Sequence, residues 1–559
     1  MHERRYVERS SRPVIKTILT GLLILMILAT LFGLWYWQTY KKKIIRDRIE
    51  KAIADKNKGF YKVRYDSLDL DDVSGWLRIY NMHINFDSGR YALADKLGIA
   101  PPLLFTMHIP EIRIEGVKTQ KALINKEIVG RKLFILNPAI DIQYTYSGKD
   151  SLRNLPTKEV YKEILGNMDL VQLDSIVIEN GRIRTRNGRN GRILAEITGI
   201  SLLLSNVRVD SLAYKDSSRY LFAKEISLDA KQVRWSSPDD LYNFRIENIS
   251  GGSLIRQLKV GAFNITPVLG ENAFANKLPV QKDRFNFSFH NILFTGIDLN
   301  KLADEYLFAE TLTIGNSSFY IYRDTGKPRD KKNRIGHYPH QTLKDLSFHF
   351  NIQKIIIPAS FVEYKERNNI TRESGKVQFY GVNALISNFT NDNARNGNIM
   401  TAQINSRFLN KTPFTSTWTF YLSGANGRFD VTGKLGPIDA QQLNELTEPM
   451  GPATIKQGQL DGMDFTLSGS DHWMRGKIKL LYKDLKVALR EKDKGAKKTD
   501  KKFLSTLLAN IIIKNDNPKG NDDARIAEVL LNRDANRSMF SLCWKTLFKG
   551  IKETVGISK

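Results

Sequence analysis

Two histidines three residues apart are the strongest candidate for metal chemistry in this 559-residue chain. His337 and His340 lie in the segment HYPH, and a pair at this spacing can hold a metal ion when a third ligand joins it. The neighbouring sequence offers no convincing third ligand. Asp69, Asp71 and Asp72 supply carboxylates, as calcium would require, but they are typical of solvated charges at the edge of a strand. We therefore predict no metal site and no other cofactor.

Motifs for phosphate binding and for hydrolysis are missing from the sequence. It contains neither an HExxH helix nor a GxSxG elbow. A single cysteine, Cys543, excludes an internal disulfide and a cysteine zinc site. Five glycine–lysine pairs lack the following Ser or Thr of a phosphate-binding loop, at Gly148, Gly326, Gly375, Gly433 and Gly476. We predict that the protein is not an enzyme.

The net charge of +26 suggests nucleic acid as a partner, but the basic residues are spread along the chain and do not gather on one helix. Denser basic runs occur at 323–334 and 490–502. Each is a solvated loop or, in the functional interpretation, a segment attracted to anionic lipid headgroups. We predict no nucleic-acid partner. With 42% hydrophobic residues and 10% aromatic ones, the chain has enough apolar side chains for a core, which excludes global disorder.

An apolar stretch near the start of the chain determines where the rest of the protein lies relative to a membrane, if it is a transmembrane helix. Residues 17–40 carry no charge and are long enough to cross a bilayer as a helix, whereas a buried core helix is the alternative. Trp35 and Trp37 lie at its far end, where amphipathic rings prefer the headgroup layer. Basic residues flank both ends, so charge does not orient the helix. We predict a short cytoplasmic tail at 1–16 and a single transmembrane helix at 17–40.

The body that follows is predicted to be mainly β. Residues 44–58 place isoleucines four apart and predict a helical connector. From 60 to 489 the apolar period is mostly two, which is typical of strands with one apolar face. The clearest alternation predicts two sets of residues that line a groove: Phe285, Phe287 and Phe289, and Phe348, Phe350 and Ile352.

Clusters of Asn and Gly between these runs predict tight turns and antiparallel hairpins. They occur at 179–181, 187–188, 250–252, 396–397 and 425–427. Helical patterns within the body are limited to 157–168 and 439–447, so the alternation of strand and helix that a parallel sheet needs is absent from the sequence. Three segments, 168–186, 220–235 and 306–322, share a plan of strand, turn and strand and predict stacked repeats.

The tail, residues 503–559, returns to helical periodicity after the basic loop at 490–502. One helix is predicted at 503–513 and another at 538–550. A basic amphipathic helix can lie in a membrane interface, and the alternative is a helix that caps the open end of the sheet. The candidate interface residues of the second helix are Phe540, Trp544, Leu547, Phe548, Lys545 and Lys549.

Residues 427–489 resemble the C-terminal region of the AsmA-like family of bacterial envelope proteins. The similar features are FDVTG at 429–433, GPID at 436–439, a strand at 455–460, and a strand at 476–489 in which YKDL is followed by four further residues. A glycine-marked hairpin at 71–86 resembles the N-terminus of that family, and LDSIVIENGRI at 173–183 is similar to its recurrent unit. Residues 90–154 depart from the pattern.

This resemblance implies a protein of the bacterial inner membrane whose body lies in the periplasm as an elongated, curved, mostly antiparallel sheet with an apolar groove. It implies a role in lipid transport or outer-membrane assembly, with membrane phospholipids and an envelope protein as partners. Physically, an open trough leaves a large apolar surface that acyl chains can fill. The alternative is a membrane-tethered scaffold of closed β-sandwich domains with dry cores.

Overall fold

The computed structural model describes residues 60–557, except 72–74, 117–126, 146–168, 370–371, 393–398, 425, 451–452 and 490–512. The predicted transmembrane helix at 17–40, the connector at 44–58 and the helix at 157–168 lie outside these residues. So do the basic loop at 490–502 and all but the last residue of the helix at 503–513. None of the helices that the structure describes is long and apolar enough to cross a membrane.

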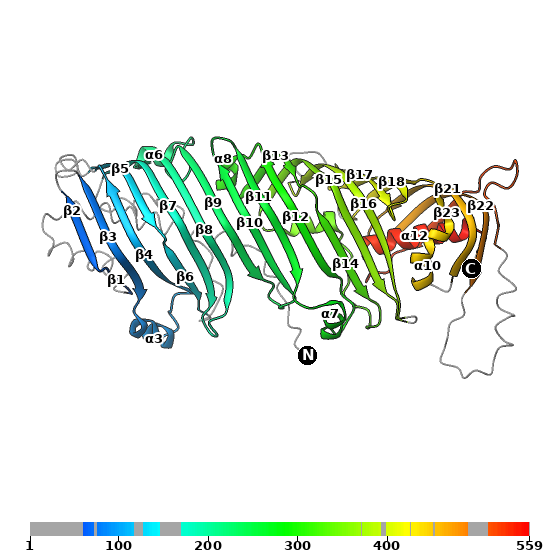
Figure 1. Cartoon of the computed structure of the whole chain (residues 1–559), viewed down its shortest axis with the longest axis horizontal. Helices are drawn as coiled ribbons and strands as arrows, with labels where there is room; N and C mark the ends of the chain where they lie inside the picture. Colours follow the sequence, from blue (N-terminus) through cyan, green and yellow to red (C-terminus); the bar gives the residue numbers. More distant parts are fainter. Residues whose placement is uncertain are drawn as a thin grey trace. The chain divides into compact units, whose positions relative to one another are not determined.

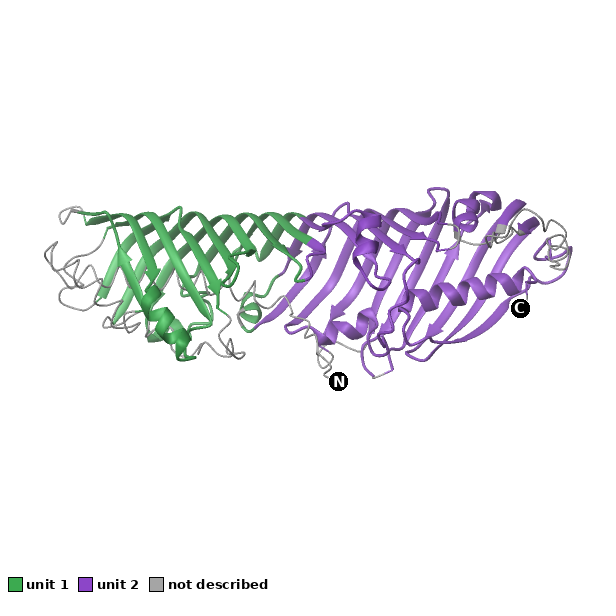
Figure 2. Ribbon diagram, turned by 90° about the horizontal axis from the view of Figure 1, so that it is seen from below, with its two compact units in different colours: residues 1–238, 243–262, 297–304 green, residues 239–242, 263–296, 305–559 purple. Residues whose placement is uncertain are grey.

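The strands form one large, mostly antiparallel sheet, accompanied by short helices (Figure 1). Within the described residues the sheet has 23 strands, which confirms the predicted mainly β class. The chain divides into two compact units, coloured separately in Figure 2. Unit 1 comprises residues 1–238, 243–262 and 297–304, and unit 2 comprises 239–242, 263–296 and 305–559.

Among the described residues, unit 1 holds the first ten strands, except for Tyr242 of β10, together with three short helices. Its strands are β1 (Tyr61–Arg64), β2 (Ser67–Asp71), β3 (Trp76–Phe86), β4 (Leu103–Glu115), β5 (Glu127–Leu136), β6 (Ala139–Tyr144), β7 (Leu170–Asn187), β8 (Ile193–Val209), β9 (Glu225–Ser236) and β10 (Tyr242–Gly252). Its helices are α3 (Ser88–Lys96), α6 (Ser211–Lys215) and α8 (Leu299–Ala303). Strand β11 (Gln257–Pro267) contributes residues to both units.

Unit 2 holds the remaining strands and helices. Its strands are β12 (Arg284–Thr295), β13 (Tyr306–Thr313), β14 (Ser318–Asp324), β15 (His349–Arg367), β16 (Ser374–Thr390), β17 (Ile399–Phe408), β18 (Thr412–Tyr421), β19 (Phe429–Leu435), β20 (Ile438–Asp439), β21 (Ala453–Gly469), β22 (Trp473–Leu489) and β23 (Ala527–Asn532). Its helices are α7 (Glu271–Lys277), α9 (Pro339–Thr342), α10 (Asn444–Met450) and α12 (Met539–Thr554), with 3₁₀ turns η1 (Leu343–Asp345) and η2 (Ala440–Leu443). Helix α12 confirms the predicted second tail helix, and η2 with α10 confirms the short helix at 439–447.

In the part of each unit that the structure describes there is one parallel step, which the prediction of antiparallel hairpins missed. In unit 1, β4 pairs antiparallel with both β5 and β6, and these pair parallel with β7. In unit 2, β12 pairs antiparallel with both β13 and β14, and these pair parallel with β15. A parallel pair needs a long return connection. Residues 325–348 make that connection between β14 and β15, so most of the basic run at 323–334 is a crossover segment.

Residues with positive φ interrupt many strands and shift the alternation of their buried positions. In β3, Ile79 is buried before Asn81 (φ 52°), and Met82 is buried after it. In β7, Asn180 (φ 53°) separates buried Ile178 from buried Gly181, and the register with β8 shifts there. Such β-bulges insert one residue, bend the strand and increase its twist. They allow both halves of a bent strand to turn apolar side chains to the same side.

The bulge in β7 corrects two sequence predictions. Residues 179–181 were predicted to form a hairpin turn, but β7 continues through them as one strand. The first proposed repeat, 168–186, is therefore a single strand and not two. The segment at 220–235 likewise contains only one long strand, β9, which leaves the predicted repeat unsupported in these two segments. Gly188, Asn426 and Gly427 do fall between strands, as predicted.

Candidate functional site

Three phenylalanines of β12 share one face of the sheet in unit 2, as the alternation predicts. Phe285, Phe287 and Phe289 are half-buried, and successive ring centroids lie 5.3 and 6.4 Å apart. The ring of Phe319 on β14 lies 5.4 Å from Phe287 and 5.2 Å from Phe289. Phe263 on β11 stacks 5.6 Å from Phe289. Aromatic pairs at these separations attract one another beyond their burial.

The aromatic row continues across the following strands. Phe319 pairs with Val362 on β15, which in turn pairs with Phe379 on β16. The ring of Phe379 lies 5.2 Å from Phe414 on β18. Every member keeps part of its surface exposed. We call this set the aromatic belt: Phe263, Phe285, Phe287, Phe289, Phe319, Phe379 and Phe414.

The second predicted groove set lies in a different environment. Phe350 is only 3% exposed, and its ring packs 5.1 Å from Phe389 and 5.9 Å from half-buried Phe348. Ile352 is 4% exposed and pairs with Phe389 on β16. Phe350 and Ile352 therefore belong to the packed interior of unit 2, whereas the β12 set lies on a partly exposed surface.

Helix α12 is amphipathic, as predicted, and lies across strands of unit 2 (Figure 2). Met539, Leu542 and Cys543 are buried in a core cluster that includes Phe429 and Ile478. The close packing of α12 against β22 depends on Gly550, because a Cβ at this position would lie 2.5 Å from the side chain of Ile478. Burial raises the pKa of the Cys543 thiol to about 12, so the thiol stays protonated. This face of α12 is structural and caps the sheet.

The opposite face of α12 carries three aromatic side chains one turn apart. Phe540, Trp544 and Phe548 are 60%, 49% and 47% exposed, and we call them the α12 ridge. The ring of Phe540 lies 5.8 Å from half-buried Trp418 on β18. Leu547, also predicted as an interface residue, is half-buried and packs against the core cluster. The buried face thus fits the capping interpretation, and the interface interpretation stays a prediction for the exposed face.

The other predicted interface residues are two lysines of α12 and two tryptophans near the start of the chain. Lys545 is exposed, whereas Lys549 donates to the carbonyl of Leu530 (3.3 Å) and lies 3.9 Å from Glu553. Trp35 and Trp37 lie outside the described residues. Of these two lysines, Lys545 is the more exposed.

A buried ion pair fixes the crossover segment in unit 2. The side chains of Asp471 and Arg533 are 2% and 1% exposed, with a 2.7 Å contact between Nη1 and Oδ1. Asp471 also accepts hydrogen bonds from the backbone N–H of Gly336 (3.0 Å) and from Nε2 of Gln341 (2.7 Å). The Arg533 guanidinium lies 4.0 Å from the ring centroid of Tyr338. This cluster joins residues 62 to 195 apart in the sequence, and no local motif identifies it.

The two candidate metal ligands are separated by their surroundings. His337 is exposed, whereas His340 is 2% exposed and neither of its ring nitrogens has a hydrogen-bond partner among the described residues. Burial lowers the pKa of His340 to about 4, so the ring is neutral at pH 7. Within the described residues, no group of three or more His, Cys, Asp or Glu side chains is placed to hold a metal ion.

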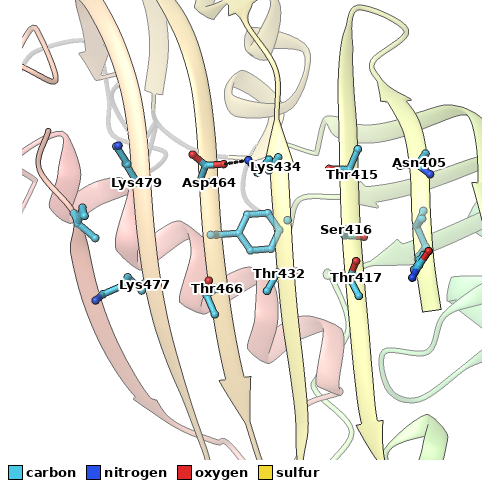
Figure 3. Close-up of a pocket in the computed structure, with 15 residues that line it drawn as sticks. Asn405, Thr415, Ser416, Thr417, Thr432, Lys434, Asp464, Thr466, Lys477 and Lys479 are labelled. Atoms are coloured by element: carbon cyan, nitrogen blue, oxygen red, sulfur yellow. Dashed lines mark ion pairs between the residues drawn. The ribbon is translucent and has the colours of Figure 1, made fainter. Parts of the chain in front are cut away.

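A shallow hollow of about 560 Å³ lies over β17, β18, β19, β21 and β22. Figure 3 shows the polar side chains that line it, among them Thr415, Thr417 and Lys479, and the 3.6 Å ion pair between Lys434 and Asp464. Four threonines and three lysines dominate its lining. Such a surface suits water or a polar ligand and does not suit an acyl chain.

The sequence analysis missed part of the site because pairing across strands decides it. Phe263, Phe319, Phe379 and Phe414 each come from a different strand and meet the β12 set only in the folded sheet. Alternation around Phe319 on β14 was the one available signal. No protein-family model matches this sequence, and no curated protein matches it.

Proposed function

We propose that the aromatic belt binds the acyl chains of membrane phospholipids. The observation that carries the proposal is the partial exposure of seven neighbouring phenylalanines in unit 2, which Val362 links between Phe319 and Phe379. Soluble proteins rarely expose contiguous apolar surfaces of this kind unless a ligand or a partner covers them. An acyl chain has no polar group that must be satisfied, so a row of rings without hydrogen-bond donors suits it.

In this proposal the protein is anchored in a bacterial inner membrane by residues 17–40, and both units lie in the periplasm. It acts there in lipid transport or outer-membrane assembly, with the belt as part of an elongated, curved trough. The resemblance of residues 427–489 to AsmA-like proteins motivates the setting, and the belt motivates the ligand. Alkaline phosphatase fused after Lys559 should be active if the body is exported, whereas an active cytoplasmic reporter at that position would contradict the orientation.

The alternative function, a scaffold with closed β-sandwich cores, fits the packing of unit 1 better than that of unit 2. Its apolar face is almost completely buried, with Leu77, Ile79, Ile84, Leu204 and Val209 each at 1% exposure or less. A buried face of this kind behaves as a dry core. The lipid proposal therefore concerns unit 2, and a binding role for unit 1 would need surfaces other than this core.

The test changes one face of β12 at a time. Phe287→Asp places a carboxylate in the belt, and Asn286→Asp places one at the adjacent exposed position of the same strand. We expect lipid extracted from the purified full-length Asn286→Asp protein to match the wild type. Phe287→Asp should keep its β circular dichroism and its resistance to protease but lose most of the co-purified lipid.

Two results would refute the proposal. Equal lipid in all three proteins would show that the belt does not hold it. Unfolding of Phe287→Asp would show that the belt is a packed core, as in a closed sandwich.

A further inference from the structure

The crossover segment between β14 and β15 lies beside the start of α12, although about 200 residues separate them. The backbone N–H of Arg334 donates to the carbonyl of Ala535 (2.8 Å), and Nη2 of Arg533 donates to the carbonyl of Arg334 (2.6 Å). The side-chain amide of Asn536, in the orientation that satisfies both its ends, donates to the carbonyl of Lys331 at 2.9 Å. These bonds hold residues 331–334, the end of the basic run, against the residues that lead into the helix.

This arrangement gathers basic side chains from three parts of the sequence. Arg329, Lys331 and Lys332 of the crossover segment are exposed, and Arg537 directly precedes the N-cap of α12. Together with Lys545 we call them the basic cluster. Burial lowers the pKa of both Arg537 and Lys545, and the positive charge of Arg329 lowers them further, as expected for neighbouring like charges.

Acidic side chains offset only part of this charge. Asp534 lies 3.6 Å from Arg537, and Asp330 lies 3.3 Å from Arg334. The charge of Glu366 also acts on Arg537, in the direction that raises its pKa. Arg329, Lys331 and Lys332 extend from the exposed side of the segment, where they can meet an anion from solution.

The basic cluster adjoins the α12 ridge. Lys545 follows Trp544 and precedes Phe548 by three residues, so helical geometry sets it beside Phe548. Lys552, four residues after Phe548, places its Nζ 5.4 Å from the centroid of that ring. Exposed aromatic rings flanked by cations are the combination that binds an interface of hydrocarbon and anionic headgroups.

We propose that the basic cluster and the α12 ridge together dock unit 2 on the surface of a bilayer that contains anionic phospholipid. The cations contact the phosphate layer, and Phe540, Trp544 and Phe548 enter the boundary between headgroups and acyl chains. The positive charge of the basic cluster favours anionic lipids, and the α12 ridge supplies apolar surface that is buried in the bilayer. This inference deepens the proposed lipid-binding function by naming the headgroup class and the point of membrane contact.

The experiment holds the full-length protein in phosphatidylcholine nanodiscs and measures its capture by separate vesicles. Vesicles of phosphatidylcholine with phosphatidylglycerol should bind the wild type, and vesicles of phosphatidylcholine alone should bind it weakly. Arg329→Glu with Lys545→Glu should weaken the capture at least ~30-fold, which is the loss expected for two basic residues at an anionic surface. Trp544→Ser should weaken it as well, and high salt should release the wild type.

A matched control keeps the change in net charge and moves it to the polar hollow. Lys434→Glu with Lys479→Glu alters the exposed Lys434 of β19 and the half-buried Lys479 of β22 and should leave vesicle capture unchanged. Equal loss in this control, or unchanged capture by Arg329→Glu with Lys545→Glu, would overturn the inference. Co-purified lipid in the belt is measured separately, so failure of membrane docking is distinguishable from failure of acyl-chain binding.

Discussion

Replacing Arg533 with methionine should open the crossover segment, because it removes the cation from a buried ion pair. The guanidinium contacts the Asp471 carboxylate (2.7 Å), the carbonyl of Arg334 (2.6 Å), the carbonyl of Arg537 (3.2 Å) and the ring of Tyr338. Breaking a buried pair by removing one partner typically costs about 3–5 kcal/mol. Asp471 retains donors from Gly336 and Gln341, so the lower end, about 3 kcal/mol, applies.

Trypsin cleavage after Arg334 reports this opening directly. The backbone N–H and carbonyl of Arg334 are both hydrogen-bonded, so the protease needs the segment to detach. When opening and closing are fast, the cleavage rate follows the open population. A loss of about 3 kcal/mol corresponds to roughly a hundredfold faster cleavage at this bond. Fragment masses over a time course identify the bond.

The matched control is Lys434→Met, which breaks the exposed pair with Asp464 (3.6 Å). Exposed pairs contribute about 0–1 kcal/mol, so cleavage after Arg334 should stay at the wild-type rate. Adding Asp471→Asn to Arg533→Met should restore part of the protection, since it removes the uncompensated carboxylate. If Arg533→Met and Lys434→Met are cleaved equally fast, the ion pair does not hold the segment and this reasoning is refuted.

Three further predictions concern single positions in unit 2. Burial lowers the pKa of His340 from 6.5 to about 4, so as the pH falls the unfolded state binds a proton at this ring before the folded state does. The free energy of unfolding should therefore fall by up to about 3 kcal/mol between pH 6.5 and pH 4. His340→Leu should remove that dependence in chemical unfolding at pH 7 and pH 4.5, and an unchanged dependence would contradict it. Gly433→Ala should cost about 1–3 kcal/mol, because its Cβ would lie 2.2 Å from Cζ of Phe465, whereas Gly270→Ala, with no atom within 4 Å, should be nearly neutral in thermal unfolding. Phe350→Asp should abolish protease resistance, because Phe350 is buried, and a folded variant would show that its packing is not essential.

The sequence predicted the mainly β class and several strands because alternation depends only on local burial. In β3, Met82 and Ile84 are buried while His83 and Asn85 are exposed, as the pattern requires. The hairpin predicted at 179–181 failed for a physical reason. Asn and Gly tolerate positive φ in tight turns and in β-bulges alike, so the residue types alone do not distinguish the two.

Other features depend on contacts that no local pattern encodes. The parallel steps at β7 and β15 follow from which strands become neighbours, and a crossover segment resembles an ordinary loop in sequence. Alternation also treated Phe287 and Phe350 as equivalent, although one lies in a partly exposed belt and the other in the interior. The exposure of these two side chains differs because it depends on the tertiary neighbours of each strand, which alternation within the strand does not encode.

Lipid cross-linking from β12 tests the central proposal most directly. A photoreactive benzoylphenylalanine at position 287 lies in the aromatic belt, and the same residue at position 286 lies on the opposite face of the strand. Irradiation of intact cells, followed by mass spectrometry of the purified full-length protein, identifies what each position touches. The proposal predicts phospholipid adducts at position 287 and none at position 286. Adducts to protein alone at position 287, or equal lipid adducts at both positions, would contradict it.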